Sequence, residues 1–376
     1  MPVKNKKNLL RYGWYLILII NVLTIVLLFM SVLAWKISPA KTTFFAYLGL
    51  GFPFLLIINL LFLVFWLIFR KWKFVLLVLV TLVLCMKPAL TYFPLHFAKN
   101  MEVPQKSIKV LSYNVMMFSW FRNKNLQENP VMAYIRDSGA DIVCIQEYLA
   151  IEGSDKFNSR EIKKALKHYP YHSVIKLEDL GDNKREVLYG IACFSKYPIN
   201  KVVQIPVETR YNAGSVLYEL SVNGKTISLF NSHLESNRLT DEDKKLYREF
   251  LAETNRQTFD EVTQNIRSRL GTAYAKRAPQ ADIVNQWIRK QKTDGIIVCG
   301  DFNDTPISYT YNRIKGDLVD SYTENGFGAG ITYHENHFWF RIDFIMHSDN
   351  MQSYGFTVDK VKYSDHYPIW TYLKIN

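Results

Sequence analysis

The stretch Ile296-Ile-Val-Cys-Gly-Asp301-Phe-Asn303 places a carboxylate and an amide directly after a short, uninterrupted apolar run. A run of this kind is typical of a strand that is buried on both faces of a sheet. Polar residues that end such a strand stand on a rigid element beside an open edge, where binding and catalytic side chains often lie. The stretch therefore predicts a sheet protein with Asp301 and Asn303 at a site beside the strand end.

The same arrangement recurs in five other segments of the chain. Each has an ordinary explanation by itself, because a lone Asn or Asp at a strand end is often only a turn residue. Six such endings in one domain are much harder to explain as turns alone. The five further segments are Ser-Tyr-Asn114, Ile-Gln-Glu147, Asn-Ser-His233-Leu, Arg-Ile-Asp343-Phe and Ser364-Asp365-His366.

The residue types at these positions form a coherent chemical set. Glu147, Asp301 and Asp365 offer hard oxygen ligands, and Asn114 and Asn303 offer neutral ones. Such ligands favour Mg²⁺ or Mn²⁺ over Zn²⁺. A carboxylate that orients an imidazole also makes the imidazole more basic. A divalent ion, amides and histidines together suit the attack of water on a phosphoester.

The rest of residues 101–376 reads as one α+β domain. The Asn223-Gly224 pair, between two alternating segments, predicts a two-residue hairpin. Hairpins mixed with helical crossovers favour a sandwich of sheets over a doubly wound parallel sheet. Helices are expected at 126–138, at 159–168 and within 241–292, and strands at 108–115, 141–146, 189–194, 216–222, 226–232, 296–299, 342–347 and 369–374.

Taken in order, the six segments and Tyr-Gly190-Ile-Ala-Cys-Phe-Ser195 resemble the endonuclease/exonuclease/phosphatase superfamily. That superfamily includes deoxyribonuclease-like nucleases, apurinic endonucleases, neutral sphingomyelinases and inositol polyphosphate phosphatases. The resemblance covers residues 107–376. It implies a four-layered α/β sandwich of two packed mixed sheets, with the site at one edge of the sheets.

The resemblance also implies roles for the carboxylates and amides. Glu147, with Asn114 and Asp365 nearby, would bind Mg²⁺ or Mn²⁺. Asp301 and Asn303 would position or activate the attacking water and the phosphate. Whether Asp301 or a histidine takes the proton of the water, and whether one or two ions act, stays open at this point.

The histidines receive roles from the same resemblance. His366, held by Asp343, would act as the base or as an imidazolium that stabilises the phosphate, and His233 would contact the phosphate or the leaving group. On the substrate side, Arg277 and Tyr211 are candidates. They lie near or within the long, mixed-charge segment that separates His233 from the Gly-Asp-Phe-Asn stretch.

The first hundred residues differ from the rest in composition and charge. Three apolar runs at about 14–35, 44–69 and 74–95 are long enough to cross a bilayer as helices. The chain has 46 Lys and Arg against 34 Asp and Glu; residues 1–100 contain 11 of these bases and no acid, so residues 101–376 carry a net charge of only +1. We therefore expect a membrane anchor of three transmembrane helices over residues 1–100 and a catalytic domain over residues 101–376.

The charges between the runs predict the orientation of the anchor. Four bases precede the first run, and Arg70, Lys71 and Lys73 lie between the second and third. The positive-inside rule then places the N-terminus and this loop in the cytoplasm. Three spans would put the catalytic domain outside the cytoplasm, and two would keep it inside.

The sequence favours a membrane-anchored, metal-dependent hydrolase of phosphoester bonds. Among these, phosphodiester bonds are the favoured substrate. The substrate could be a lipid headgroup, a small phosphoester or nucleic acid. The near-neutral charge of residues 101–376 lacks the basic excess expected of a protein that grips duplex DNA. The alternatives are an extracytoplasmic nuclease and, in another class, a non-catalytic membrane receptor or scaffold on the same fold.

Overall fold

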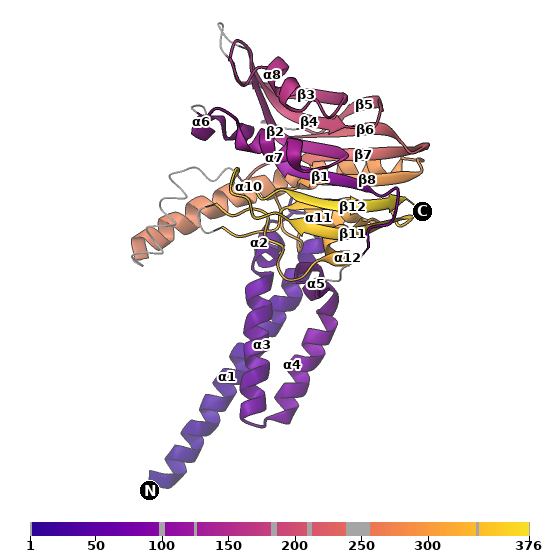
Figure 1. The fold of residues 1–376 in the computed structure, drawn as a ribbon. Helices are drawn as coiled ribbons and strands as arrows, with labels where there is room; N and C mark the ends of the chain where they lie inside the picture. Colours follow the sequence, from indigo (N-terminus) through magenta and orange to yellow (C-terminus); the bar gives the residue numbers. More distant parts are fainter. Residues whose placement is uncertain are drawn as a thin grey trace.

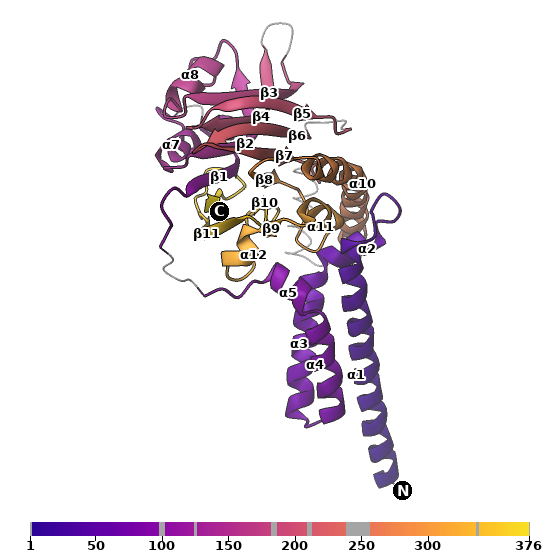
Figure 2. The same ribbon diagram turned by 90° about the vertical axis from the view of Figure 1, so that its right-hand side faces the viewer.

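The computed structural model describes residues 2–97, 102–123, 126–181, 186–208, 213–237, 256–335 and 338–375. Within these residues the chain forms a sandwich of two six-stranded sheets, preceded by a stalk of N-terminal helices (Figures 1 and 2). The expected α+β sandwich of two mixed sheets is confirmed.

The first sheet has the strand order β11-β12-β1-β2-β4-β3, and only its β1–β2 pair is parallel among the described strands. Its outer face is covered by α7 (Pro130–Asp137) and α8 (Ser159–Ala165), which bury Val131, Ile135 and Ile162 against it. Its strands are β1 (Ile108–Asn114), β2 (Ile142–Ile151), β3 (Tyr171–Asp179), β4 (Val187–Ser195), β11 (Met351–Val358) and β12 (Ile369–Ile375).

The second sheet has the order β5-β6-β7-β8-β10-β9, with a parallel β7–β8 pair. Its outer face packs on α10 (Arg256–Arg289) and α11 (Tyr309–Lys315), while the two inner faces share one apolar core. Helices, two sheets and helices therefore make four layers. The strands are β5 (Ile199–Ile205), β6 (Gly214–Val222), β7 (Lys225–His233), β8 (Gly295–Asp301), β9 (Val319–Asp320) and β10 (Asp343–His347).

The predicted hairpin joins β6 to β7, with Val222 opposite Lys225. Asn223 and Gly224 have positive φ angles of 51° and 82°, as a type I′ turn requires. The short helices α6 (Trp120–Asn123) and α12 (Ser321–Asn325) follow β1 and β9.

The N-terminal helices are α1 (Pro2–Val32), the short 3₁₀ turn η1 (Leu33–Trp35), α2 (Phe44–Leu50), α3 (Phe52–Ile68), α4 (Trp72–Leu84) and α5 (Met86–Tyr92). Residues 12–35 form one helical segment long and apolar enough to cross a membrane. The described chain thus has one such span, or up to three if each of two bent helix pairs counts as one.

The second and third expected spans each consist of two helices with a bend between them. The bend is 59° between α2 and α3 and 61° between α4 and α5. Pro53 and Pro88 explain both breaks, because proline has no N–H to donate and its ring clashes with the carbonyl four residues earlier. Those carbonyls belong to Gly49 and Leu84, at the ends of α2 and α4.

Polar side chains bind the N-terminal helices to one another. Asn21 of α1 donates to Asn59 of α3 over 3.4 Å and accepts from the indole of Trp66 over 2.8 Å. Asn21, Asn59 and Trp66 are all fully buried. Side-chain hydrogen bonds of this kind hold helices together where lipid surrounds them.

Candidate active site

The site lies where the ends of three strands of the second sheet meet. In the register, His233 at the end of β7 pairs with Asp301 at the end of β8, and Asp301 pairs with Asp343 at the start of β10. On the facing sheet, β1 ends at Asn114 beside Gln146 of β2. The strands therefore deliver side chains from distant parts of the chain to one edge of the sandwich.

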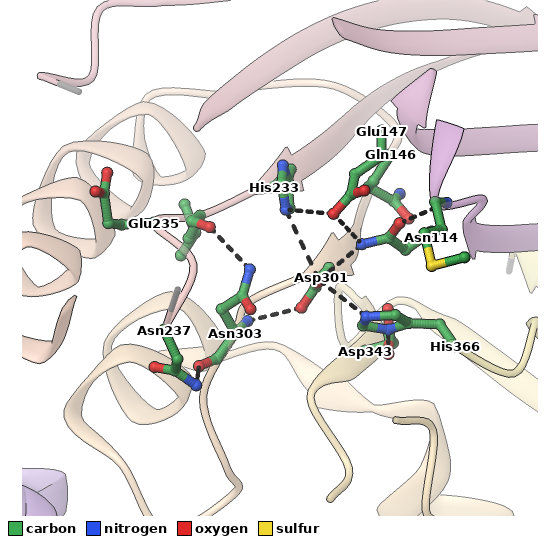
Figure 3. Close-up of polar contacts among 12 residues, drawn as sticks. Asn114, Gln146, Glu147, His233, Glu235, Asn237, Asp301, Asn303, Asp343 and His366 are labelled. Atoms are coloured by element: carbon green, nitrogen blue, oxygen red, sulfur yellow. Dashed lines mark hydrogen bonds and ion pairs between the residues drawn. The ribbon is translucent and has the colours of Figure 1, made fainter. Parts of the chain in front are cut away.

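Asp301 is the centre of this cluster (Figure 3). Its Oδ2 atom accepts a hydrogen bond from the amide of Asn114 over 3.0 Å and lies 3.9 Å from Nε2 of His233 and 3.7 Å from Nε2 of His366. Its Oδ1 atom accepts from the backbone N–H of Asn303 over 2.8 Å. Burial and the carboxylate of Asp343 raise the pKa of Asp301 to about 6, against the opposing effect of the two imidazoles.

His366 forms a pair with Asp343. Its Nδ1 atom lies 2.8 Å from Oδ2 of Asp343, and both side chains are buried. Burial alone lowers the pKa of His366, but the carboxylates of Asp343 and Asp301 outweigh it and raise that pKa well above 6.5. The ring of Tyr333 packs edge-on against the imidazole, with 5.0 Å between the centroids. The pair thus holds a cationic imidazole beside Asp301.

Glu147 and Asn114 lie together on the facing sheet. The amide nitrogen of Asn114 is 3.2 Å from Oε1 of Glu147, and that oxygen is 3.6 Å from Nε2 of His233. Glu147 has a positive φ of 53°, where β2 leaves its regular pairing with β4. A non-glycine residue in this region costs free energy and is found at functional sites. The irregularity turns this carboxylate out of the sheet face.

Asn303 and its neighbours are shaped by close backbone contacts. Asn303 has a φ of 54°, and its side-chain amide donates to the carbonyl of Leu234 over 2.9 Å. Gly300 has a φ of 132°, and a Cβ atom there would lie 1.9 Å from the carbonyl oxygen of Ser232. Only glycine fits at this position, which explains the Gly before Asp301 in the opening stretch.

The donor set fits a hard divalent cation. Asp301, Asp343 and His366 each place one ligand atom within 4.8 Å of the others, so these three residues could hold a metal ion. Glu147 and Asp365 line the same cavity as Asp301 and His366, which brings four carboxylates around two imidazoles. Buried negative charge of this kind calls for a compensating cation, and oxygen ligands favour Mg²⁺ or Mn²⁺.

The group that reaches metal-binding geometry differs from the predicted ligand trio. Glu147 and Asn114 are in contact with each other, and Asp365 is tied to the strand that carries Asn114, since Ser364 Oγ donates to the Asn114 carbonyl over 2.8 Å. The assignment of the metal to Glu147, Asn114 and Asp365 stays a prediction.

A cavity extends from the cluster toward the N-terminal helices. Its lining combines polar side chains, which include Glu147, Asp301, Asn303, Asp365 and His366, with apolar ones. One of the apolar residues, Leu50, belongs to α2 and not to the sandwich.

Of the two residues predicted to contact substrate, the structure describes only Arg277. Arg277 is fully buried, and its Nη1 donates to the Glu235 carbonyl over 2.7 Å and to Asn237 over 2.8 Å. Its Nε lies 3.6 Å from the carboxylate of Asp304. These contacts tie the segment after His233 to the loop after β8. Tyr211 lies outside the described residues.

Two buried amides behind the cluster were not predicted as site residues. Gln146 donates to Oδ1 of Asn231 over 2.6 Å, and Asn231 donates to the carbonyls of Ile145 and Ala192. The pair joins the two sheets directly beneath Glu147 and His233. Their positions next to those residues in the sequence were the only available signal, because the contact itself spans 85 residues.

Comparison with known proteins agrees with the sandwich fold. The sequence profile of the Endonuclease/Exonuclease/phosphatase family matches residues 111–366. The chain belongs to this family and is a phosphoesterase of it. A second profile, a domain of unknown function, matches residues 15–92. None of the curated proteins matches the chain.

Comparison with solved structures finds matches of low sequence identity. Humanized D. rerio TDP2 carrying 14 mutations is 15% identical, with a TM-score of 0.50 over 72% of this chain and 100% of that one. The human nocturnin catalytic domain with bound sulfate is 15% identical, with a TM-score of 0.48 over 73% and 97%. An endonuclease/exonuclease/phosphatase from Bacteroides vulgatus is 16% identical, with a TM-score of 0.48 over 72% and 99%. The first of these supports the fold alone.

Proposed function

We propose that the chain is a membrane-anchored, divalent-metal-dependent phosphodiesterase whose sandwich lies outside the cytoplasm. The cluster around Asp301 carries this proposal, because it places an amide, a backbone N–H and two imidazoles within 3.9 Å of one buried carboxylate. A non-catalytic receptor does not require such a concentration of buried charge. Buried charge costs stability, so its presence here supports a catalytic role.

The proposed reaction is hydrolysis by water. The water oxygen forms a new bond to phosphorus, the bond from phosphorus to the leaving oxygen breaks, one water proton goes to a base and the leaving oxygen takes up a proton. Asp301 is the candidate base, since its Oδ2 stands between both histidines and Asn114. His366, paired with Asp343, offers positive charge to the phosphate oxygens, and His233 offers a ring N–H group.

Glu147, with Asn114 and Asp365, is the proposed holder of the metal, and Asp301, Asp343 and His366 are the alternative set. When bound, the ion supplies Lewis-acid stabilisation of the charge that develops on phosphate. Asn303, fixed by its bond to the Leu234 carbonyl, orients the phosphate. Arg277 is assigned a positioning role, because its contacts are with the two loops that flank the site.

Metal removal tests the proposal on the full chain in detergent. With Mg²⁺, we expect hydrolysis of bis(p-nitrophenyl) phosphate, followed as released p-nitrophenol. Excess EDTA is expected to reduce the rate by at least about 10²-fold, and Mg²⁺ or Mn²⁺ to restore it, because the ion neutralises charge in the transition state. The receptor alternative gains support if the folded, metal-loaded chain hydrolyses neither this compound, nor plasmid DNA, RNA or phospholipid.

The arrangement of the stalk supports the proposed orientation. The N-terminus and the turn between α3 and α4 lie at the end of the stalk that points away from the sandwich (Figures 1 and 2). Arg70, Lys71 and Lys73 lie at that turn. If the helices cross the bilayer, these bases and the sandwich are on opposite sides, and the positive-inside rule puts the bases in the cytoplasm.

A topology reporter tests this orientation. Alkaline phosphatase fused after residue 376 should be active in cells, and a fluorescent protein that matures only in the cytoplasm should stay dark at the same position. The reverse pattern would mean that α4 and α5 do not complete a crossing. A fusion at the α3–α4 turn is the matched control and should give the opposite signals.

A further inference from the structure

We propose that the cavity beside Asp301 binds the apolar chain of a membrane lipid, and that the phosphoester headgroup of this lipid is the substrate. The inference deepens the proposed phosphodiesterase function and rests on it. It is carried by a single juxtaposition: the wall of the catalytic cavity is built partly by α2, a helix that continues into a candidate membrane span.

Two chemically different groups of side chains line the cavity. The cluster around Asp301 suits a phosphate and a metal ion. The apolar group, called here the apolar end, suits hydrocarbon because it consists of aromatic and branched side chains. Its residues are Leu50, Leu270, Tyr274, Phe338, Phe340 and Ile342, and the polar Ser236, Asn237, Asp304 and Thr305 line the same cavity. A lipid with a phosphoester headgroup combines the same two chemistries.

The apolar end is joined to the stalk through α2. Ala46 of α2 shares a buried cluster with Leu270 and Tyr274 of α10, and Tyr47 and Leu50 pack against that cluster. The rings of Tyr47 and Tyr274 meet edge to face, 5.8 Å apart. Because α2 leads directly into α3, the apolar residues of α2 connect the cavity to a candidate membrane span, from which a hydrocarbon chain would enter.

The stalk is also fixed to the loop that follows Asn303. The indole of Trp35 donates to the Pro306 carbonyl over 2.8 Å, and Asn312 donates to the carbonyl of Trp35 over 3.0 Å. A Cβ atom on Gly49 would lie 2.3 Å from the carbonyl oxygen of Ile307, so the two backbones touch. The end of the stalk nearest the sandwich therefore contacts residues 306–312, which follow Asn303 closely in the chain.

Exposed aromatic side chains surround this side of the sandwich. Trp339, between two cavity residues, is 60% exposed, and Phe327 is 57% exposed. Phe97 packs on Phe327 with 5.1 Å between the rings, and Leu95 forms a bridge to Phe327. Aromatic residues of this kind concentrate where protein meets the headgroup layer. The segment that lines the cavity is therefore expected to sit at the membrane surface.

The charge of the cavity lining favours a lipid substrate over nucleic acid. None of the described residues that line it is a lysine or an arginine. A protein that binds along a nucleic-acid backbone neutralises several phosphates with basic side chains. A lipid has one phosphate in its headgroup, and the metal and the histidines are enough to neutralise it.

The experiment compares long-chain and short-chain substrates. The full chain is reconstituted in nanodiscs that contain dioleoyl phosphatidylglycerol, dioleoyl phosphatidylethanolamine or sphingomyelin, with Mg²⁺, and both the lipid and the water-soluble products are measured. The headgroup cleaved fastest is then compared with its dihexanoyl or short-chain analogue. We expect kcat/KM to be higher for the long chain, because its methylene groups are buried in the cavity.

Leu50→Asn and Phe340→Asn test the apolar end directly. Each should lower the ratio of long-chain to short-chain kcat/KM by about tenfold, roughly the effect of losing two buried methylene groups. The ratio is independent of partial misfolding, since both rates scale with the same amount of folded enzyme. Phe44→Asn is the matched control, because Phe44 lies on α2 but is exposed and outside the cavity lining, and the ratio should stay within about twofold.

The outcomes distinguish this inference from the proposed function. Hydrolysis of bis(p-nitrophenyl) phosphate or of DNA, without hydrolysis of any of the lipids, overturns the lipid substrate and leaves the phosphodiesterase standing. An unchanged ratio in both cavity variants overturns the apolar subsite. A binding test needs no activity: in EDTA, a phospholipid with a diazirine in its acyl chain should crosslink within residues 338–342 or α2, and crosslinks confined to α3 and α4 would contradict the proposal.

Discussion

Asp301→Asn is expected to lower kcat for bis(p-nitrophenyl) phosphate by about 10²–10⁴-fold, the usual effect of removing a general base or a main charge in the site. The asparagine keeps the shape of the side chain and can still accept the 2.8 Å hydrogen bond from the backbone of Asn303. It cannot take a proton from water, and it removes the negative charge that faces both histidines. The measurement is steady-state kinetics on the purified full chain with saturating Mg²⁺.

Asp349→Asn is the matched control for this variant. Asp349 is exposed and follows β10 at the end of the strand opposite Asp343, so its loss should leave kcat within about twofold. A kcat for Asp301→Asn within tenfold of the unmodified chain would exclude Asp301 as the base. His366→Ala would then be the next variant to measure, because His366 is the other candidate.

Arg341→Met is expected to destabilise the chain by about 3–5 kcal/mol, because it leaves Asp320 as an uncompensated buried charge. Arg341 and Asp320 are 1% and 0% exposed and lie 2.9 Å apart. Arg341 also donates to the carbonyl of Thr91 in α5, so it joins the stalk to the sandwich just before Ile342 and Asp343. A loss of this size corresponds to a fall of about 6–20 °C in Tm, measured by thermal unfolding of the full chain in detergent.

Two further variants separate charge burial from a general loss of contacts. Arg313→Met removes an ion pair to Asp282 in which both side chains are partly exposed, and it should cost at most about 1 kcal/mol. Asp320→Asn combined with Arg341→Met should recover part of the lost stability, since no unpaired charge then remains. Equal Tm values for Arg341→Met and Arg313→Met would contradict this account.

The sequence predicted the central strands well and missed the edges. All eight predicted strands are present, and the four that escaped prediction, β3, β5, β9 and β11, are the edge strands of the two sheets. Central strands are buried on both faces and leave a continuous apolar run, whereas β3 and β5 are half exposed and mix polar with apolar residues.

The site residues could be predicted singly but not as a set of contacts. Asp301 was visible because an apolar run ends on it, and His233 and Asn114 were visible for the same reason, whereas Asp343 stands at the start of its strand. The register that brings His233, Asp301 and Asp343 into one row depends on pairing between strands that lie far apart in the chain. No local pattern encodes that register.

The N-terminal helices show the same division. Hydropathy and charge indicated three apolar runs and their order, since each run is a continuous stretch of apolar residues along the chain. The packing of α2 on α10 depends on how the stalk meets the sandwich. The sequence alone therefore treated the helices as a tether with no part in the site.

The amino-acid sequence by itself determined the family, the central strands, the polar residue types beside the strands and the excess of basic residues in the first hundred positions. Each of these features depends on residues that are neighbours along the chain. Only the tertiary structure decided that Leu50 lines the same cavity as Asp301 and that Arg341 joins α5 to the site. Those contacts connect residues about 250 positions apart. They arise from the packing of complete elements against one another, which leaves no periodic signal in either segment.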